Sequence, residues 1–221
     1  MTPYYQDDAV TILSAADATC GQTADLKSSA NSPSATSPVP WPPAGVKPYY
    51  SDEAVCIILG DCRDVLPTLG PVDLVLTDPP YGIGFASQPT KWQRLNGQAP
   101  EAWDEGIAAD AVEQAIELAP DSIIWGGQYY PLAIARSWLA WVKPDAPPSM
   151  GSFELAWSTL ATPSRHIVCT HVRTPERVGH PTQKPLRVMR WCLQRVPLAV
   201  SILDPFMGSG TTLRAAKDLG R

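Results

Sequence analysis

The sequence predicts an α/β fold, and two observations carry that prediction. Short β-rich apolar runs alternate with stretches whose apolar residues recur at helical spacing. Two turns, one rich in proline and one rich in glycine, each follow such an apolar run directly. Alternating strands and helices predict a largely parallel sheet with helices on both faces, and ligands bind such sheets at the carboxyl ends of the strands.

Strands are expected where apolar and β-branched residues cluster between turn signals, and helices where apolar residues keep one face. The expected strands are 55–59, 73–77, 122–125, 154–158 and 200–203. One helix is expected to bury Leu186, Met189, Leu193 and Val196 and to expose Arg187, Arg190 and Gln194. Other helices are expected around 112–119 and over 211–219, the last closed by Gly220.

The first 47 residues are predicted to form a flexible N-terminal segment. Residues 14–47 are rich in Ser, Ala, Thr and Pro and show no hydrophobic period. Residues 3–10 nearly repeat as residues 48–55, and only the second copy leads into a folded pattern. We therefore expect one folded domain over 48–221, which suits a chain of this length.

Composition narrows the class of protein. No apolar run approaches the length of a membrane span, and residues 1–8 are too polar for a signal peptide. Five scattered cysteines fit neither a disulfide framework nor zinc spacing. These features predict a cytoplasmic protein without a metal site.

The charge is unevenly distributed along the chain. The net charge is −5, but residues 161–195 hold seven basic residues and one acidic residue, whereas residues 50–160 hold five basic and fifteen acidic ones. A local basic face is what a phosphate backbone attracts, although such clusters are often only solvated surface. The candidate DNA-binding residues are Arg165, Arg173, Arg177, Arg187 and Arg190.

The proline-rich turn, Asp78-Pro79-Pro80-Tyr81, suits a flat base that carries an exocyclic amine. Such an amine is a poor nucleophile, because its lone pair is delocalised into the ring. Asp78 and the carbonyl of Pro79 could accept hydrogen bonds from its two N–H groups and so turn the lone pair toward a methyl donor. The prolines stiffen the backbone, and Tyr81 offers a face for stacking. A plain turn after a strand is the alternative.

The glycine-rich turn follows the last expected strand and opens a helix. Its glycines allow close backbone approach to a ligand. It lacks the third glycine of a dinucleotide fingerprint and the lysine of a phosphate loop, so it suits an uncharged part of a nucleoside cofactor. The candidate cofactor residues in it are Asp204, Phe206, Gly208, Ser209, Gly210 and Thr211.

Three strings in this order, residues 78–81, 180–185 and 204–212, resemble the amino-methylating DNA methyltransferases in which the catalytic string precedes the cofactor string. Residues 123–130 and 154–157 resemble phage-type members. The resemblance covers roughly residues 49–221. It implies a permuted Rossmann-like sheet, S-adenosylmethionine as methyl donor, and duplex DNA with a flipped target base.

The resemblance also extends the cofactor site. It implies that Asp61 lies near the adenine of the cofactor and that His180, Thr182 and Lys184 lie over its methionine end. Asp rather than Ser at position 78 favours N6 of adenine over N4 of cytosine. Family members continue into a strand whose acidic residue holds the ribose, so we expect this sheet to lack its last strand.

Several alternatives stay open. They are an N4-cytosine enzyme, an amino-methyltransferase for RNA or protein glutamine, and a truncated, silent DNA-binding remnant. A short target-recognition region is expected around residues 142–179, which suggests a short recognition sequence or a homodimer. The expected setting is the cytoplasm of a bacterium or of a phage-infected host.

Overall fold

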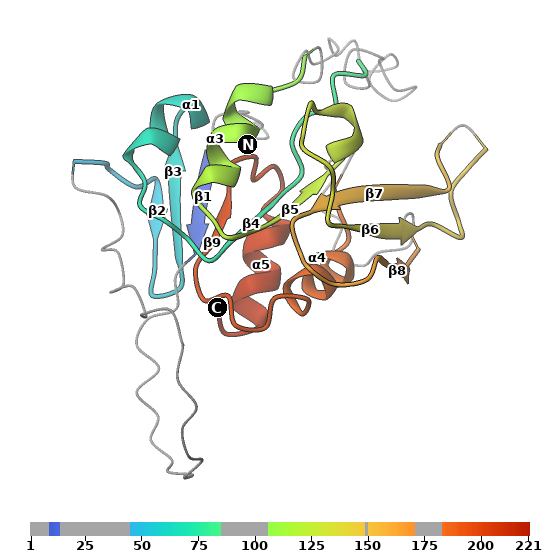
Figure 1. Cartoon of the computed structure of the whole chain (residues 1–221). Coiled ribbons are helices and arrows are strands. Elements are labelled where there is room, and N and C mark those ends of the chain that lie inside the picture. The colour runs from blue at the N-terminus through green and yellow to red at the C-terminus, as the bar shows by residue number, and fades with distance from the viewer. Residues whose placement is uncertain (1–8, 14–44, 85–105, 149, 171–182) are drawn as a thin grey trace, which may run out of the picture.

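A mixed sheet with helices on both faces forms the molecule (Figure 1). The computed structural model describes residues 9–13, 45–84, 106–148, 150–170 and 183–221. Over these residues the sheet has nine strands in the order β2-β3-β1-β9-β4-β5-β7-β6-β8. Its strands are β1 (Ala9–Leu13), β2 (Tyr50–Ser51), β3 (Val55–Leu59), β4 (Leu74–Thr77), β5 (Asp121–Trp125), β6 (Ser137–Val142), β7 (Phe153–Ser158), β8 (Arg165–Val168) and β9 (Ile202–Asp204).

The helices are short and follow strands. They are α1 (Cys62–Val65), α3 (Ala109–Glu117), α4 (Leu186–Leu193) and α5 (Thr211–Asp218), with 3-10 turns at Leu66–Thr68 and Gly127–Tyr129. The α/β class expected from the sequence is therefore confirmed, and the five expected strands and three expected helices form within a few residues of their expected bounds. None of the helices in the described part of the chain is long and apolar enough to cross a membrane.

Alternation along the strands divides the core into two layers. Leu74 and Leu76 of β4 pack with α4 and α5 on one face, whereas Val75 packs with α1 and α3 on the other. Figure 1 shows the same division, with the red α5 and orange α4 on one side of the sheet and the green and cyan helices on the other. The centre of the sheet, strand β4 above all, is therefore buried on both faces.

Parallel pairing, expected for most of the sheet, is found at its centre and at one edge. β4 pairs in parallel with both β5 and β9, and β6 pairs in parallel with β8. β7 is antiparallel to β5 and to β6, and β1 is antiparallel to β3 and to β9. The strands missed by the sequence reasoning include β6, whose side chains alternate between buried and half-buried positions. Its two tryptophans and its alanine hide that alternation in a sequence reading.

The first copy of the N-terminal repeat is also part of the sheet, which corrects the expectation that only the second copy folds. β1 begins at Ala9, near the end of that copy, and pairs antiparallel with β3, which begins at Val55, the last residue of the second copy. The same β-rich pattern that makes β3 a strand is present in residues 9–13. β1 also gives β9 a neighbour on the side away from β4, where the sequence predicted a missing strand.

Candidate active site

The directions of the strands bring the two predicted turns to the same edge of the sheet. β4, β5 and β9 run in parallel, so their carboxyl ends meet there. β7 is antiparallel to β5 and β6 is antiparallel to β7, so the start of β7 and the end of β6 reach that edge as well. Residues from five separate parts of the sequence can therefore face one another at this edge.

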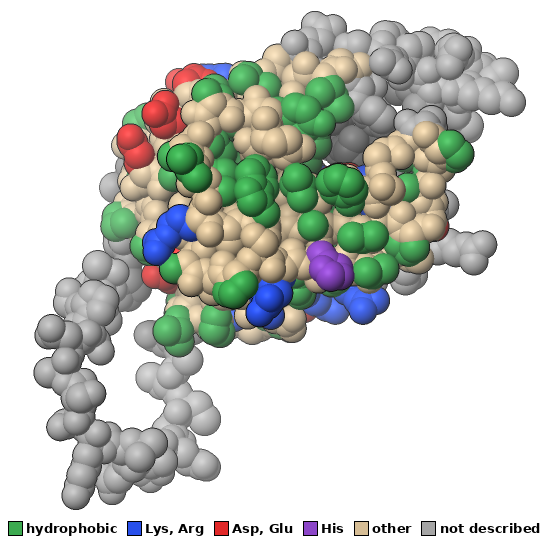
Figure 2. Space-filling view, turned by 45° about the vertical axis from the view of Figure 1, so that its right-hand side comes forward, with side chains coloured by type: hydrophobic (Ala, Val, Ile, Leu, Met, Phe, Trp, Pro, Cys, Tyr) green, Lys and Arg blue, Asp and Glu red, His purple; other side chains and the backbone are tan. Residues whose placement is uncertain are grey.

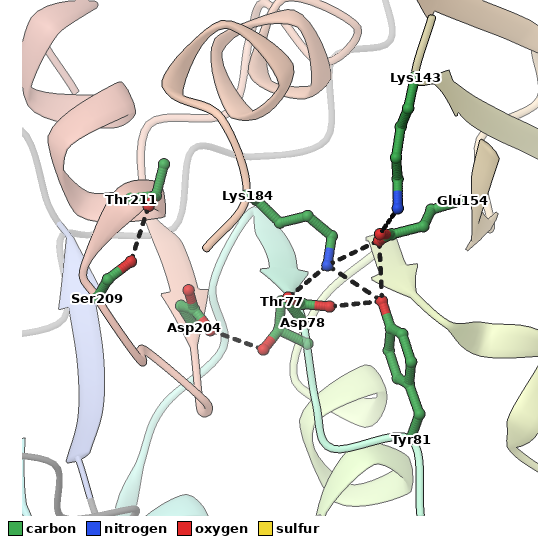
Figure 3. A network of polar contacts seen from close by, with 9 residues as sticks. All are labelled: Thr77, Asp78, Tyr81, Lys143, Glu154, Lys184, Asp204, Ser209 and Thr211. Carbon is green, nitrogen blue, oxygen red and sulfur yellow. Dashed lines mark hydrogen bonds and ion pairs between the residues drawn. The ribbon is translucent and has the colours of Figure 1, made fainter. Parts of the chain in front are cut away.

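Asp78 stands directly after β4, and both oxygens of its carboxylate have partners (Figure 3). The Tyr81 hydroxyl donates to Oδ1 at 2.7 Å, and the Lys184 ammonium donates to Oδ2 at 2.5 Å. Lys184 also lies 3.1 Å from the Tyr81 oxygen and 3.0 Å from Glu154 Oε2. Lys184 is therefore placed beside the catalytic candidate, whereas the resemblance assigned it to the cofactor.

The ring of Tyr81 is held by the turn after β5. It stacks on Tyr129, with ring centroids 5.2 Å apart and an angle of 25° between the planes. A Cβ built on Gly126 would lie 2.0 Å from the Tyr81 ring, and Gly126 has a φ of +67°. The Tyr130 hydroxyl donates to the carbonyl of Pro80. Tyr129 is 45% exposed, so the stack continues to the surface of the molecule.

A second carboxylate, Glu154 at the start of β7, completes the charged cluster. It forms ion pairs with Lys184 and with Lys143, which follows β6. Burial raises the pKa of Glu154, but the charges of the two lysines outweigh it and lower that pKa to about 2. Burial raises the pKa of Tyr81 well above its usual value, and the charges of Asp78 and Glu154 add to that effect. The Tyr81 hydroxyl therefore stays protonated and serves as a donor.

The catalytic strand and the strand of the glycine-rich turn are joined by a buried hydrogen bond. The Thr77 hydroxyl donates to Asp204 Oδ1 at 2.6 Å, and the backbone N–H of Phe206 donates to the same oxygen at 3.1 Å. Burial raises the pKa of Asp204 to about 6. Asp204 therefore lies beneath the turn and shapes its first residues.

The glycine-rich turn itself leaves room for a ligand. Gly208 and Gly210 have φ values of +52° and +74°, a region that L side chains rarely adopt. A Cβ on Gly210 would meet no heavy atom within 4 Å. Gly210 is the N-cap of α5 and provides no side-chain cap, and the hydroxyls of Ser209 and Thr211 lie 3.1 Å apart beside it. The space, the glycines and the absence of charge fit a nucleoside cofactor.

Asp61 reaches the same edge from β3, because β3 and β9 both pair antiparallel with β1 and so run in the same direction. Its carboxylate caps α1 by accepting from the Arg63 N–H at 2.9 Å. His180 and Thr182 lie outside the described residues. Their expected contact with the cofactor stays a prediction.

The candidate DNA-binding arginines are only partly described, since Arg173 and Arg177 lie outside the described residues. Arg165 on β8 and Arg187 on α4 are exposed. Arg190 instead forms an ion pair with Asp218 of α5. Figure 2 shows Asp and Glu side chains gathered at the upper left of one face and most of its Lys and Arg side chains along the lower margin.

The sequence reasoning gave no role to several residues of the site. Glu154 is the one charged residue in an otherwise apolar strand, and Lys143 directly follows an apolar strand. A charged residue at such a position indicates an ion pair, because a charge that is taken out of water needs a partner. The sequence alone does not tell which partner, since the pairing of β6 with β7 decides it.

A protein family and several known proteins are similar to this chain. The family model for N6/N4 methyltransferases, described as DNA methylase, matches residues 124–221. Type II methyltransferase M2.LlaDCHI of Lactococcus lactis subsp. cremoris is 24% identical over 232 residues, which covers 79% of this chain and 85% of that protein. Type II methyltransferase M.HindIII of Haemophilus influenzae is 42% identical over 57 residues, which covers 25% of this chain and 18% of that protein.

These matches agree with the geometry of the site. A carboxylate follows one parallel strand, and a glycine turn with open space at Gly210 follows the neighbouring one. The match of residues 124–221 and the two relatives support an amino-methylating DNA methyltransferase, a family whose members use S-adenosylmethionine as methyl donor.

Proposed function

We propose that this protein transfers a methyl group from S-adenosylmethionine to N6 of adenine in duplex DNA. The observation that supports this most is the hydrogen bond between Thr77 and Asp204, because it ties the strand that ends in Asp78 to the strand that ends in the glycine turn. A base held at Asp78 and a cofactor held at Gly208 and Gly210 would then meet across neighbouring strands. Effective catalysis by positioning needs the reacting atoms roughly 3–3.5 Å apart.

In this proposal the chain orients the amine and stabilises its charge. The bound cofactor supplies an electrophilic methyl group. Asp78 accepts one N–H of the amine, and the carbonyl of Pro79 accepts the other, so that the nitrogen lone pair faces the methyl carbon. As the N–C bond forms and the C–S bond breaks, positive charge grows on the nitrogen beside Asp78. The extra proton on the nitrogen then leaves to solvent.

The target base would have to leave the duplex to reach this site. We propose that it is flipped and rests against the stack formed by Tyr81 and Tyr129, whose outer ring is accessible. We also propose the permuted order of the family for this chain, since the strand of Asp78 precedes that of the glycine turn. The proposed location is the cytoplasm, and a homodimer would supply further DNA contacts.

The choice of adenine rests on the acidic residue at position 78 and is the point to test first. The protein is incubated with unmethylated genomic DNA and methyl-tritiated cofactor, and the digested nucleosides are separated. N6-methyladenine supports the proposal. N4-methylcytosine in its place would contradict the choice of base and leave the family assignment intact.

A silent DNA-binding remnant is the second candidate. The observation behind it is that β9 has β1, a strand from the N-terminal segment, as its antiparallel neighbour. Calorimetric titration with S-adenosylmethionine separates it from an enzyme. A folded protein that still binds DNA but does not bind S-adenosylmethionine would favour the remnant. The Asp78→Ala variant serves as the background control for the assay.

A further inference from the structure

Four charged side chains form a chain of contacts at the active-site edge, with both lysines buried and both carboxylates partly exposed (Figure 3). Lys143 pairs with Glu154, Glu154 pairs with Lys184 at 3.0 Å, and Lys184 pairs with Asp78 at 2.5 Å. The two lysine side chains are only 4% and 5% exposed. Buried charges at this level are rare unless they are paired, so the cluster needs an explanation.

The cluster holds two carboxylates and two ammonium groups, so its charges balance. Burial lowers the pKa of Lys184, but the charges of Asp78 and Glu154 outweigh it and hold that pKa above its usual value. Lys184 is therefore a cation at neutral pH and cannot take a proton from the reacting amine. Its remaining role toward Asp78 is to hold the carboxylate in place.

Lys184 is shared between the two carboxylates. The more closely it approaches Asp78, the more it neutralises the charge that Asp78 offers to the amine. The ion pair with Glu154 attracts Lys184 away from Asp78, and the ion pair between Lys143 and Glu154 weakens that attraction in turn. The negative charge available at Asp78 thus depends on two residues that lie further along the cluster.

We propose that Glu154, supported by Lys143, is a positioning residue for methyl transfer. It fixes Lys184 between two carboxylates, and this sets both the orientation and the effective charge of Asp78. The inference rests on the proposed role of Asp78. It adds that residues which touch neither base nor cofactor control the rate.

The first test replaces Glu154→Gln, which leaves the buried cluster with one positive charge in excess. We expect kcat to fall at least about tenfold, a coupling within the usual range for residues of one network, while calorimetric affinity for S-adenosylmethionine stays the same. A kcat within twofold of wild type would overturn the proposal.

The decisive variant is the double replacement Glu154→Gln with Lys143→Met, which restores the balance of charge. We expect the double variant to be more active than Glu154→Gln alone. If Glu154 had a merely structural role, losing two buried side chains would be worse than losing one. A double variant as slow as the single variant, or slower, therefore contradicts the proposal.

A readout without turnover separates this inference from the proposed function. The chain has only six lysines, so the side-chain signals of ¹³C-labelled lysine can be followed by NMR. We expect the titration of Lys184 to move to lower pH in Glu154→Gln. An unchanged titration sinks the inference, whereas a moved titration in a protein that methylates no DNA sinks only the proposed function. If Glu154→Gln does not fold, Lys143→Met alone must lower kcat at unchanged cofactor affinity, or the proposal fails.

The surface ion pair between Lys217 and Asp52 is the matched control, since it joins the same kinds of group at 2.5 Å far from Asp78 in the sequence. Lys217 there is 48% exposed. Asp52→Asn, alone and with Lys217→Met, should leave kcat unchanged, because solvent screens exposed charges.

Discussion

The turn after β4 and the turn after β9 end neighbouring parallel strands, yet different forces hold them. Asp78 is held by the hydroxyl of Tyr81 in its own turn and by Lys184 from the residues before α4, and Glu154 of β7 holds Lys184 in turn. The turn after β9 is fixed by its own backbone, with Gly208 and Gly210 at positive φ and a hydrogen bond from Phe206 to Asp204. The first arrangement orients one polar group, and the second leaves space for a ligand.

The two carboxylates behind these turns, the half-buried Glu154 and the buried Asp204, differ in the same way. Glu154 faces two lysines, whose charges lower its pKa to about 2 despite burial. Asp204 has only neutral donors around it, so burial raises its pKa to about 6. A carboxylate paired with cations is thus a fixed charge at neutral pH, whereas one paired with hydroxyl and amide groups titrates near it.

The largest effect is expected from Asp78→Ala, which removes the amine's acceptor and leaves the glycine turn intact. Methyl transfer should fall by about 10²–10³ or more, the cost of losing one acceptor or donor for transition-state charge. Cofactor affinity, measured by calorimetry on the same preparation, should stay nearly the same. Because Lys184 loses one of its two carboxylate partners in this variant, a thermal melt checks that the protein is still folded. Near-normal methyl transfer would refute the role of Asp78.

The reverse result is expected from Gly210→Val. A β-branched side chain at a φ of +74° is strained and would enter the open space that the cofactor needs. Calorimetric binding of S-adenosylmethionine should be lost, while the titration of Lys184 stays as in wild type. Unchanged cofactor binding would show that this turn is not the cofactor site.

A third variant, Gly126→Ala, tests whether packing of the Tyr81 ring matters for the catalytic turn. The new Cβ would lie 2.0 Å from the ring, so Tyr81 must move and its hydrogen bond to Asp78 must change. We expect kcat to fall by up to about 10²-fold, since small displacements at a reacting centre are costly.

Gly84→Ala is the matched control for that collision. Gly84 has a φ of +66°, close to that of Gly126, but a Cβ there would meet nothing within 4 Å. Both variants bear the backbone strain of a left-handed residue, and only one displaces Tyr81. Equal losses in the two variants would show that strain, rather than the ring, is responsible.

The raised pKa of Asp204 predicts a pH effect on stability rather than on the rate. Its carboxyl prefers the protonated form in the folded protein, so the extra stability is complete below about pH 4 and is lost as the pH rises through about 6. A shift of this size is worth about 3 kcal/mol. Denaturant titrations across that range measure the free energy of unfolding, which should fall with rising pH in the wild type and not in Asp204→Asn. An identical pH dependence in both proteins would contradict the assignment to Asp204.

The smallest effect is expected at the exposed arginines. Arg165→Ala and Arg187→Ala should weaken binding to all DNA sequences alike and lower the salt dependence by roughly 0.9 per lost phosphate contact. Arg190→Ala is the control, since Arg190 already pairs with Asp218. If the slope is unchanged in the first two variants, these arginines do not contact phosphates.

The sequence predicted the parts of the site that lie within one continuous string. Residues 78–81 and 204–211 are recognisable because the chemistry depends on neighbouring residues, and the strands before them are mostly apolar. Glu154 and Lys143 were missed because their role depends on how β6 and β7 pair, which is a long-range contact. β1 was missed for the same reason, because its pairing with β3 and with β9 is also a long-range contact.

The most direct test of the central claim is a bisubstrate analogue in which N6 of adenosine is joined to the cofactor at the sulfonium position. If the two turns share one reaction centre, this analogue should bind more tightly than S-adenosylmethionine, and Asp78→Ala should lose only that gain. Gly210→Val should lose binding altogether. An analogue that binds wild type no better than the cofactor does would contradict the account.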